Sequence, residues 1–318
     1  MPSVSIIIPT YNASLLIERA LRSIIQQTGN HDVEIIIVDD CSTDNTLDIV
    51  NNLAISSVTI LKQDSNRGPS AARNRGLEAA TGEYIAFLDG DDFWEQDFLN
   101  EATAFLQNHP QAVAVSVMQR HKTFNGKDSI VPAQTPVQQP VLLDDFYDFW
   151  AKYNHVCTGS VLIRSAVAKA TGGQREDFRV CEDLEFWALV ATYGPWGFIP
   201  KVLFTSDGGA ITNKIGWRKK AQKRWASAVP IDEWSKRILQ RLPDNLKDSF
   251  PRAQARIARG LAYSMMMDGR YELARQDVLK CSALFPQNRL NPIFAICSRS
   301  RCLWFLFATI LRIREYLR

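Results

Sequence analysis

Residues 33–46 read VEIIIVDDCSTDNT, and the order of residue types in this stretch predicts one unit of an α/β fold. The apolar, mostly β-branched run from Val33 to Val38 is typical of a buried strand. Two carboxylates, Asp39 and Asp40, follow it directly. From about Thr43, apolar residues recur at helical spacing, so we expect a helix after a short acidic loop.

The same pattern repeats on both sides of this stretch. We expect further strands at residues 4–8, 58–61 and 84–88, and further helices at residues 16–25 and 70–80. Strands that alternate with helices at this rhythm form βαβ units and a mostly parallel sheet. Ligands bind such sheets beyond the carboxyl ends of the strands, so the residues after each strand are the candidates for a site.

Beyond residue 110 the pattern predicts strands at 113–118, 157–163 and 197–204, a helix at 183–193, and a loop at 125–140. Residues 218–318 have an almost wholly helical pattern. Within them Ala258, Leu261, Ala262, Gly269, Tyr271, Ala274 and Pro286 have the spacing of one tetratricopeptide-like repeat. One repeat cannot form a solenoid, so a helical hairpin is the simpler interpretation. We predict a domain at 1–215 and a helical region at 216–318.

The 318 residues suffice for one α/β domain and an appendage, and 46% apolar and 22% charged residues are ordinary globular values. The six cysteines include no C-x-x-C pair, which argues against a zinc site or a redox couple and favours a cytoplasmic protein with free thiols. The opening MPSVSIIIPTYN lacks a basic segment and leads straight into a strand pattern, so we expect no signal peptide.

The charge is divided unevenly along the chain. Residues 1–213 carry 15 Lys and Arg against 26 Asp and Glu, a net charge of −11, whereas residues 214–318 carry 22 against 8, a net charge of +14. An acidic body can recruit a cation, and a basic region suggests contact with phosphates, such as those of an anionic membrane surface. No nucleic-acid recognition module is visible, so we expect no nucleic-acid partner.

Carboxylates gather at two of the expected strand ends, in Asp39-Asp40 and in Asp89-Gly90-Asp91-Asp92. Two like charges about 5 Å apart cost roughly 3 kcal/mol at an effective dielectric of 20, and under about 1 kcal/mol in water. Such a cluster is therefore either exposed or neutralised by a cation. Oxygen ligands at this spacing suit Mg²⁺ or Mn²⁺, which normally share their coordination with substrate phosphates.

Five blocks in a fixed order carry a resemblance to a known family. They are PTYN (9–12), VDDCSTDNT (38–46), NRGPSAARNRG (66–76), GEYIAFLDGDDFW (82–94) and CEDLEFW (181–187). Together they resemble the non-processive, bacterial-type family 2 glycosyltransferases, over about residues 3–210. The resemblance implies a GT-A fold, a Rossmann-like mostly parallel sheet with flanking helices, followed here by an all-α region.

The resemblance also implies roles for individual residues. Donor binding is implied for Pro9, Thr10, Tyr11, Asp39, Asp40, Asn66, Gly68, Arg73, Asp89 and Gly90. Among these, Thr10, Tyr11 and Asp39 match the positions that hold the base and ribose, and a carboxylate is a suitable acceptor for the imide N–H of uracil. Binding of Mn²⁺ or Mg²⁺ is implied for Asp89, Asp91 and Asp92. Glu182 and Asp183 match the acidic pair, with Asp183 as the general base.

Each of these segments also has a structural interpretation. Thr43 is placed to cap the following helix, Asp91 and Asp92 could begin a helix before Trp94, and Arg73 could be a solvated helix charge. Glu182 and Asp183 have the charge that favours the start of a helix. For His155, a core or acceptor-loop position is favoured over a base, and for the aromatic residues around it packing is favoured over sugar stacking.

The predicted function is transfer of a sugar from a nucleoside-diphosphate sugar, UDP being favoured, to a saccharide or lipid-linked acceptor in cell-surface polysaccharide or glycolipid synthesis. By analogy with the family we expect inversion at the anomeric carbon. Two other functions stay open. One is a nucleotide-sugar-binding or scaffold protein without turnover; the other, a nucleotidyltransferase, would normally begin with a glycine-rich loop where Pro9-Thr10-Tyr11-Asn12 stands.

Two further features bear on the partners. The Q-x-x-R-W block of processive members is one residue short here, at Gln222 to Trp225, and no transmembrane helix is expected. Residues 302–311 form a mostly apolar run flanked by arginines, too short to span a bilayer. This run is either a helix docked on the protein or a helix at a membrane interface, with Trp304 and the arginines at the headgroups. The second alternative predicts peripheral attachment to the cytoplasmic face of a membrane.

Overall fold

The computed structural model describes residues 1–122, 128–207, 217–285 and 291–317. The chain divides into two compact units, which are described separately below. The first unit contains Met1–Phe146, Tyr153–Glu176 and Phe186–Thr212, and the second contains Tyr147–Lys152, Asp177–Glu185 and Asn213–Arg318.

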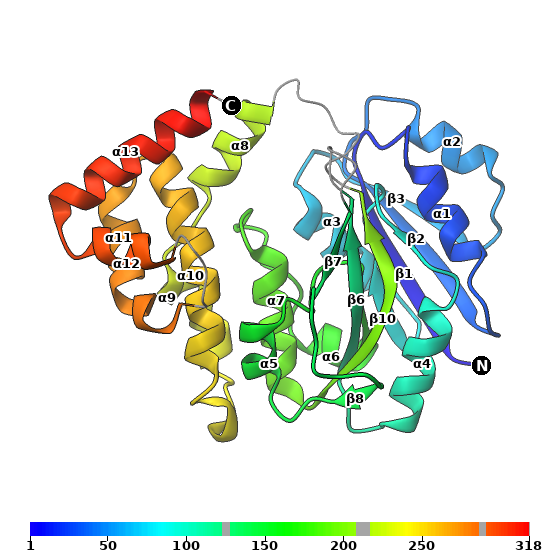
Figure 1. Cartoon of the computed structure of the whole chain (residues 1–318). Helices are drawn as coiled ribbons and strands as arrows, with labels where there is room; N and C mark the ends of the chain where they lie inside the picture. The colour runs from blue at the N-terminus through cyan, green and yellow to red at the C-terminus, as the bar shows by residue number, and fades with distance from the viewer. Residues whose placement is uncertain (123–127, 208–216, 286–290, 318) are drawn as a thin grey trace. The chain divides into compact units, whose positions relative to one another are not determined.

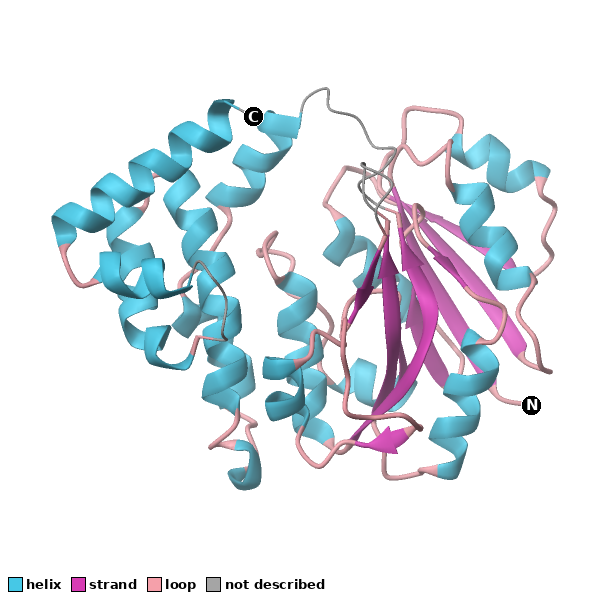
Figure 2. Ribbon diagram, in the orientation of Figure 1, coloured by secondary structure: helices cyan, strands magenta, loops and turns pink. Residues whose placement is uncertain are grey.

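The first unit is built on one open mixed sheet in the order β3-β2-β1-β4-β9-β6-β10-β5 (Figure 2). The strands are β1 (Ser3–Thr10), β2 (Asp32–Asp39), β3 (Val58–Lys62), β4 (Tyr84–Phe87), β5 (Phe93–Trp94), β6 (Ala114–His121), β7 (Ser129–Val131), β8 (Val141–Leu142), β9 (Val161–Arg164) and β10 (Trp196–Ser206). β7 and β8 pair with β6 and β10 beside this path. β1, β2, β3 and β4 run parallel, as do β6 and β10, so their carboxyl ends lie along one edge.

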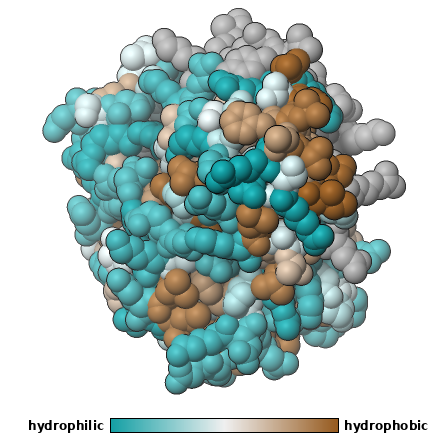
Figure 3. All heavy atoms as spheres, turned by 90° about the vertical axis from the view of Figure 1, so that its left-hand side faces the viewer, coloured by the Kyte–Doolittle hydropathy of each residue, from teal (hydrophilic) through white to brown (hydrophobic). Residues whose placement is uncertain are grey.

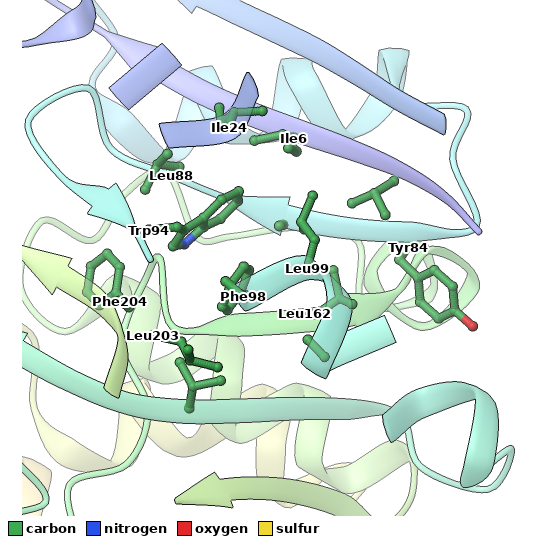
Figure 4. Packing of buried hydrophobic residues seen from close by; sticks show 14 of the residues in the cluster. Ile6, Ile24, Tyr84, Leu88, Trp94, Phe98, Leu99, Leu162, Leu203 and Phe204 are labelled. Carbon is green, nitrogen blue, oxygen red and sulfur yellow. The ribbon is translucent and has the colours of Figure 1, made fainter. Parts of the chain in front are cut away.

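Helices cover the sheet and connect its strands (Figure 1). They are α1 (Ile17–Ile25), α2 (Thr46–Asn52), α3 (Pro69–Ala79), α4 (Phe98–Asn108) and α6 (Ser165–Ala170). Residues of α1 and α4 pack with the strands into one core, in which Ile24, Trp94, Phe98 and Phe204 lie close together (Figure 4). The Trp94 indole N–H donates to the Gly159 carbonyl oxygen at 2.6 Å, which satisfies its polar atom inside this core.

Most elements of this unit match the sequence-based prediction, and three differ. α2 begins at Thr46 rather than near Thr43, with Asn45 as its N-cap, so Thr43 does not cap it. The strand expected at 157–163 begins only at Val161, because Gly159 has a φ of +93° that interrupts an extended chain. The expected loop at 125–140 contains β7, a three-residue strand that depends on its pairing with β6. Residues 123–127 lie outside the described part.

The second unit is helical, as predicted. Its elements are α8 (Trp217–Ala226), α9 (Ile231–Leu239), α10 (Phe250–Met267), α11 (Tyr271–Cys281), α12 (Asn291–Ser298) and α13 (Arg301–Leu317), together with the segment Tyr147–Lys152 of α5 (Phe146–Lys152). α10 and α11 form the predicted hairpin, and Gly269, with a φ of +89°, ends α10. Pro286 and the predicted boundary at 215/216 lie outside the described residues.

α7 (Glu182–Val190) begins in the second unit. Its Glu185 is fully buried and forms a bidentate ion pair with Arg237 of α9, with Nε–Oε1 and Nη2–Oε2 distances of 2.8 and 2.5 Å. The Trp234 indole N–H donates to the Cys181 carbonyl oxygen at 3.0 Å. Two residues of α9 thus fix the segment in which α7 starts. In the described part of the chain, no helix is both long enough and apolar enough to span a membrane.

Candidate functional site

Three loops at the carboxyl edge of the sheet meet in the first unit. The Asp40 N–H, after β2, donates to the Thr10 carbonyl oxygen, at the end of β1, at 2.8 Å. A methyl group added to Gly90, after β4, would lie 3.4 Å from Ala13 Cβ and 3.9 Å from Thr10 Oγ1. The turn at 89–92 therefore lies against the loop after β1, and the strand-end residues that the sequence predicted are neighbours.

The loops after β1 and β2 are locked together by side chains. Asn12 has a φ of 51°, and its Oδ1 accepts the Thr43 N–H at 2.7 Å, while its own N–H donates to Ser42 Oγ at 2.9 Å. The Ala13 N–H donates to Thr46 Oγ1 at 2.9 Å. These bonds leave the Tyr11 side chain, which is 50% exposed, projecting from a fixed loop.

Asp39 and Asp40 are both buried, but their carboxylates have different partners. Asp40 Oδ1 accepts from Gln63 Nε2 at 2.8 Å and from the Arg67 N–H at 2.7 Å, and Oδ2 accepts the Gly68 N–H at 2.7 Å. The Asp39 carboxylate accepts only the Ser42 N–H, at 3.2 and 3.3 Å, among the bonds of the described residues. A carboxylate has about four acceptor positions, so Asp39 retains capacity for a ligand donor, and Asp40 is used to shape the loop.

The predicted donor-binding residues Asn66 and Gly68 belong to this same arrangement. Asn66 Nδ2 donates to the Asp40 carbonyl oxygen at 3.0 Å. Gly68, with a φ of +90°, is the N-cap of α3, and Pro69 is its first helical residue. Both residues therefore join the loop after β2 to the start of α3, which carries Arg73.

Arg73 is only 4% exposed, so it is not the solvated helix charge of the structural interpretation. Its Nη2 donates to Asp89 Oδ1 at 2.6 Å, and its Nη1 donates to Gln174 Oε1 at 3.2 Å. The guanidinium thus compensates the first carboxylate of the acidic turn and fixes its position.

At Asp91 and Asp92, the surroundings disfavour the charged form of the carboxylate. Burial, followed by repulsion from Asp89, raises the pKa of Asp91, and burial with repulsion from both Asp89 and Asp91 raises the pKa of Asp92 well above its usual range. Asp92 is 5% exposed, and its Oδ1 accepts the Asp207 N–H at 2.9 Å. Residues 93–94 form β5, so Asp91 and Asp92 do not begin a helix.

Two residues at this turn were missed in the sequence. Arg19 of α1 pairs with the buried Asp207 carboxylate, and its Nη2 donates to the Asp91 carbonyl oxygen at 2.5 Å. Asp207 directly follows β10, so the strand-end rule applied to the expected strand at 197–204 would have found it. Arg19 has no such signal, because an arginine on an amphipathic helix has the pattern of a solvated residue.

A divalent cation fits the chemistry of the turn, since repelling carboxylates with raised pKa values are stabilised by a nearby positive charge. Within the described residues, however, no three His, Cys, Asp or Glu side chains are grouped so that they could hold a metal ion. The turn alone is therefore an incomplete coordination shell. Mg²⁺ and Mn²⁺ commonly complete theirs with substrate phosphates and water.

The predicted base, Asp183, and its neighbour Glu182 lie in the first turn of α7, within the second unit. Both are partly exposed. The left-handed Cys181, with a φ of 59°, precedes them and turns the chain into the helix. Burial, followed by repulsion from the Asp183 and Glu182 carboxylates, raises the pKa of the Cys181 thiol to about 12, so this cysteine stays protonated at neutral pH.

His155 is fully buried, as the core interpretation predicted. Its Nδ1 lies 2.8 Å from Ser116 Oγ, and its ring contacts Phe146 and Phe198 edge-on at centroid distances of 5.3 and 5.7 Å. The aromatic residues Phe146, Tyr147 and Trp150 are buried as well, so packing rather than sugar stacking explains them.

An open depression of about 760 Å³ lies beside the acidic turn, between α1 and residues 93–97. Arg19, Arg22 and Phe93 contribute to its lining, and the Arg19 guanidinium stands 4.8 Å from the centre of the Phe93 ring. None of the predicted donor-binding residues lines this depression. It is therefore distinct from the strand-end site.

The sheet is mixed rather than mostly parallel as predicted, because β5, β7, β8 and β9 pair antiparallel with their neighbours. Its parallel strands still end in carboxylates and a buried arginine along one edge, where α/β proteins typically bind ligands. Comparison with known proteins specifies the class. Residues 5–170 match the family model "Glycosyl transferase family 2", which covers more than half of the chain. The chain belongs to glycosyl transferase family 2.

Three relatives illustrate the relationship. The putative teichuronic acid biosynthesis glycosyltransferase TuaG of Bacillus subtilis is 30% identical over 195 residues, which are 61% of this chain and 73% of TuaG. The UDP-Glc:alpha-D-GlcNAc-diphosphoundecaprenol beta-1,3-glucosyltransferase WfaP of Escherichia coli is 41% identical over 107 residues, 34% of this chain and 42% of WfaP. A Haemophilus influenzae glycosyltransferase, 44% identical over 112 residues, is likewise matched over only 44% of its length and 34% of this chain.

Solved structures confirm the predicted GT-A fold. Residues 1–349 of Staphylococcus aureus TarS, in complex with UDP-GlcNAc, align with a TM-score of 0.69 at 18% identity, over 96% of this chain and 90% of that one. The mannosyltransferase PcManGT of Pyrobaculum calidifontis, in complex with GDP-Man and Mn²⁺, aligns with a TM-score of 0.61 at 19% identity, over 99% and 88% of the two chains. At these identities the likeness concerns the fold.

Proposed function

We propose that this chain transfers a sugar from a UDP-sugar to a saccharide or lipid-linked acceptor in the synthesis of a cell-surface glycan, with inversion and with a divalent cation. The observation that carries the proposal is the meeting of three strand-end loops around Asp39, Arg73 and the acidic turn. Membership of family 2 and the activities named for TuaG and WfaP support the substrate class.

Recognition of the base rests on the loops after β1 and β2. The half-exposed Tyr11 ring offers a surface for stacking, and the acceptor capacity that Asp39 retains suits the imide N–H of uracil. Asp40 acts indirectly, because its carboxylate is occupied by loop donors and keeps the shape of the loop. These contacts orient the donor so that its diphosphate reaches the turn at 89–92.

At that turn, Asp91 and Asp92 would hold Mg²⁺ or Mn²⁺, and Asp89 would remain paired with Arg73 or share in the site. A cation held there would neutralise the charge of the departing diphosphate without proton transfer. Arg73 keeps the first carboxylate in place and adds a fixed positive charge close to where the diphosphate charge develops.

Asp183 would accept the proton of the acceptor hydroxyl as that oxygen attacks the anomeric carbon, and Glu182 beside it would orient or bind the acceptor. Asp183 lies in the first turn of α7, where a carboxylate complements the helix dipole. The ion pair between Glu185 and Arg237 fixes the first turn of α7 and thereby the position of the proposed base. One base without a separate protein nucleophile implies a single displacement.

The two carboxylate variants Asp91→Asn and Asp183→Asn test the assignment. Thermal unfolding with UDP-sugars, with and without Mn²⁺, measures donor binding, since a bound ligand raises Tm. We expect Asp91→Asn to abolish both the Mn²⁺-dependent rise and sugar transfer, and Asp183→Asn to keep the rise and lose transfer by at least about 100-fold. Full transfer by Asp183→Asn would exclude it as the base, and the absence of donor hydrolysis by the wild type would favour a binding protein without turnover.

A further inference from the structure

The surface formed by α12 and α13 exposes an unusual number of large apolar side chains. Figure 3 looks onto the helical side of the molecule and shows hydrophobic side chains gathered beside hydrophilic ones. The exposed apolar residues of the two helices, between 42 and 60% exposed, are Ile293, Ile296, Leu303, Phe305, Leu306, Ile310 and Ile313. We refer to these seven residues as the apolar face. Monomeric proteins rarely expose large side chains in such density without a binding partner.

α13 is attached to its unit mainly by residues outside the apolar face, although the Phe305 ring packs edge-on against Tyr271 at a centroid distance of 4.8 Å. Trp304 and Ala308, on another side of the helix, are fully buried, and the Trp304 indole N–H donates to the Tyr271 carbonyl oxygen at 2.7 Å. Trp304 is therefore not available at a membrane interface, which agrees with the docked-helix alternative and differs from the alternative that placed Trp304 at the headgroups. The helix is docked along one stripe and leaves a second apolar stripe outside.

That second stripe has helical spacing. Leu303, Leu306, Ile310 and Ile313 follow one another at intervals of three, four and three residues, which places them on one side of α13. A 17-residue helix is about 25 Å long. An apolar stripe of this length suits a flat hydrophobic surface along which the helix can lie.

The charges around the apolar face select its partner. Exposed Arg299, Arg301 and Arg314 flank it, and Glu315 is the one acidic residue among residues 299–318 of the sequence. Residues 214–318 together carry a net charge of +14. A second copy of the chain would bring an equally positive surface, whereas phosphate headgroups would neutralise it.

We propose that the apolar face and its arginines bind an anionic lipid surface, with α13 lying parallel to the bilayer. The leucine and isoleucine side chains of the stripe would enter the boundary of headgroups and acyl chains, and the arginines would contact lipid phosphates. This inference goes beyond the proposed function, because it requires neither donor nor acceptor.

Co-sedimentation of the full chain with vesicles tests the proposal directly. One set of vesicles contains phosphatidylcholine alone, and the other also contains phosphatidylglycerol. We expect the wild type to bind the anionic vesicles at least about tenfold more strongly than the neutral ones, and to lose most of this difference at high salt.

Leu306→Glu places a charge in the stripe and is expected to weaken binding at least about tenfold. Leu239→Glu is the matched control, because Leu239 ends α9 and is 53% exposed against 59% for Leu306. Arg299→Gln with Arg314→Gln keeps every apolar side chain and is expected to weaken binding to anionic vesicles only. Donor-induced changes in Tm should be the same in all variants, which separates this proposal from the proposed function.

Three results would overturn the proposal. The first is a wild-type protein that does not bind anionic vesicles more strongly than neutral ones. The second is equal binding of anionic vesicles by Leu306→Glu and Leu239→Glu. The third is a dimer, detected by light scattering without lipid, that Leu306→Glu dissociates, since a second copy would then cover the apolar face.

Discussion

Asp39 and Asp40 are adjacent in the sequence and equally buried, yet only one of them retains acceptor capacity for a ligand. Three donors from residues 63–68 occupy the Asp40 carboxylate, whereas Asp39 accepts a single long bond from Ser42. The sequence could place both at a strand end, because the apolar run before them ends there. It could not separate their roles, since those depend on where residues 63–68 fold back.

Arg19 supports the acidic turn from α1. It pairs with the buried Asp207 and donates to the Asp91 carbonyl oxygen. Arg19→Met keeps much of the side-chain length but leaves the Asp207 carboxylate buried without this partner. Because the Arg19 side chain is one third exposed and thus partly screened, we expect a loss of about 2 kcal/mol, or roughly 4–8 °C in Tm.

Arg22→Met is the control for this prediction, one turn further along α1. Arg22 is 58% exposed and pairs with the exposed Glu18, so its loss should change stability by less than about 0.5 kcal/mol. Thermal unfolding followed by circular dichroism compares the two. Equal Tm values for both variants would show that Arg19 is merely another surface charge.

At the scale of elements, the parallel half of the sheet was predictable and the later strands were not. β1 to β4 have long apolar runs and helices between them, so period and order are sufficient to place them. β5, β7 and β8 contain only two or three residues each, and their stability comes from pairing with β6 or β10, which no local pattern encodes. The same limit applies to Arg19, whose partner is 188 residues away.

The buried pair of Glu185 and Arg237 fixes the start of α7, so we expect that element to respond to its loss. Arg237→Met leaves a fully buried carboxylate without its counter-charge, which costs about 3–5 kcal/mol. Tm should fall by at least about 6 °C, and sugar transfer should fall more than donor binding, because the proposed base is two residues before Glu185.

Replacing both partners tests whether the charge, and not the packing, causes that loss. In Glu185→Leu with Arg237→Met, no buried charge remains, and buried pairs replaced by apolar residues are often neutral for stability. We therefore expect the double variant to recover most of the Tm lost by Arg237→Met. A double variant at least as unstable as the single one would contradict this explanation.

At the scale of the whole molecule, the two compact units are interleaved along the chain. The second unit includes 147–152 and 177–185, although the sequence on either side of these segments belongs to the first. In the second unit, the fully buried Tyr147 ring packs edge-on against Phe250 at 5.0 Å, and Arg256 donates to the Trp150 carbonyl oxygen at 3.2 Å. A hydrophobicity pattern cannot reveal this interleaving, because it does not show which distant residues Tyr147 and Trp150 contact.

Interleaving predicts that a fragment of residues 1–215 is not a stable protein. In that fragment Tyr147 loses Phe250, and Glu185 loses Arg237, so an aromatic ring and a carboxylate are both left without their partners. Removing one partner of a buried ion pair costs about 3–5 kcal/mol, a large share of the 5–15 kcal/mol by which domains are stable. We expect insoluble expression, or a Tm far below that of the full chain.

A fragment of residues 1–285 keeps Phe250 and Arg237 while it lacks α12 and α13, so it should retain the donor-dependent rise in Tm. If residues 1–215 instead fold, melt like the full chain and bind donor equally well, then the segments at 147–152 and 177–185 do not need their helical partners.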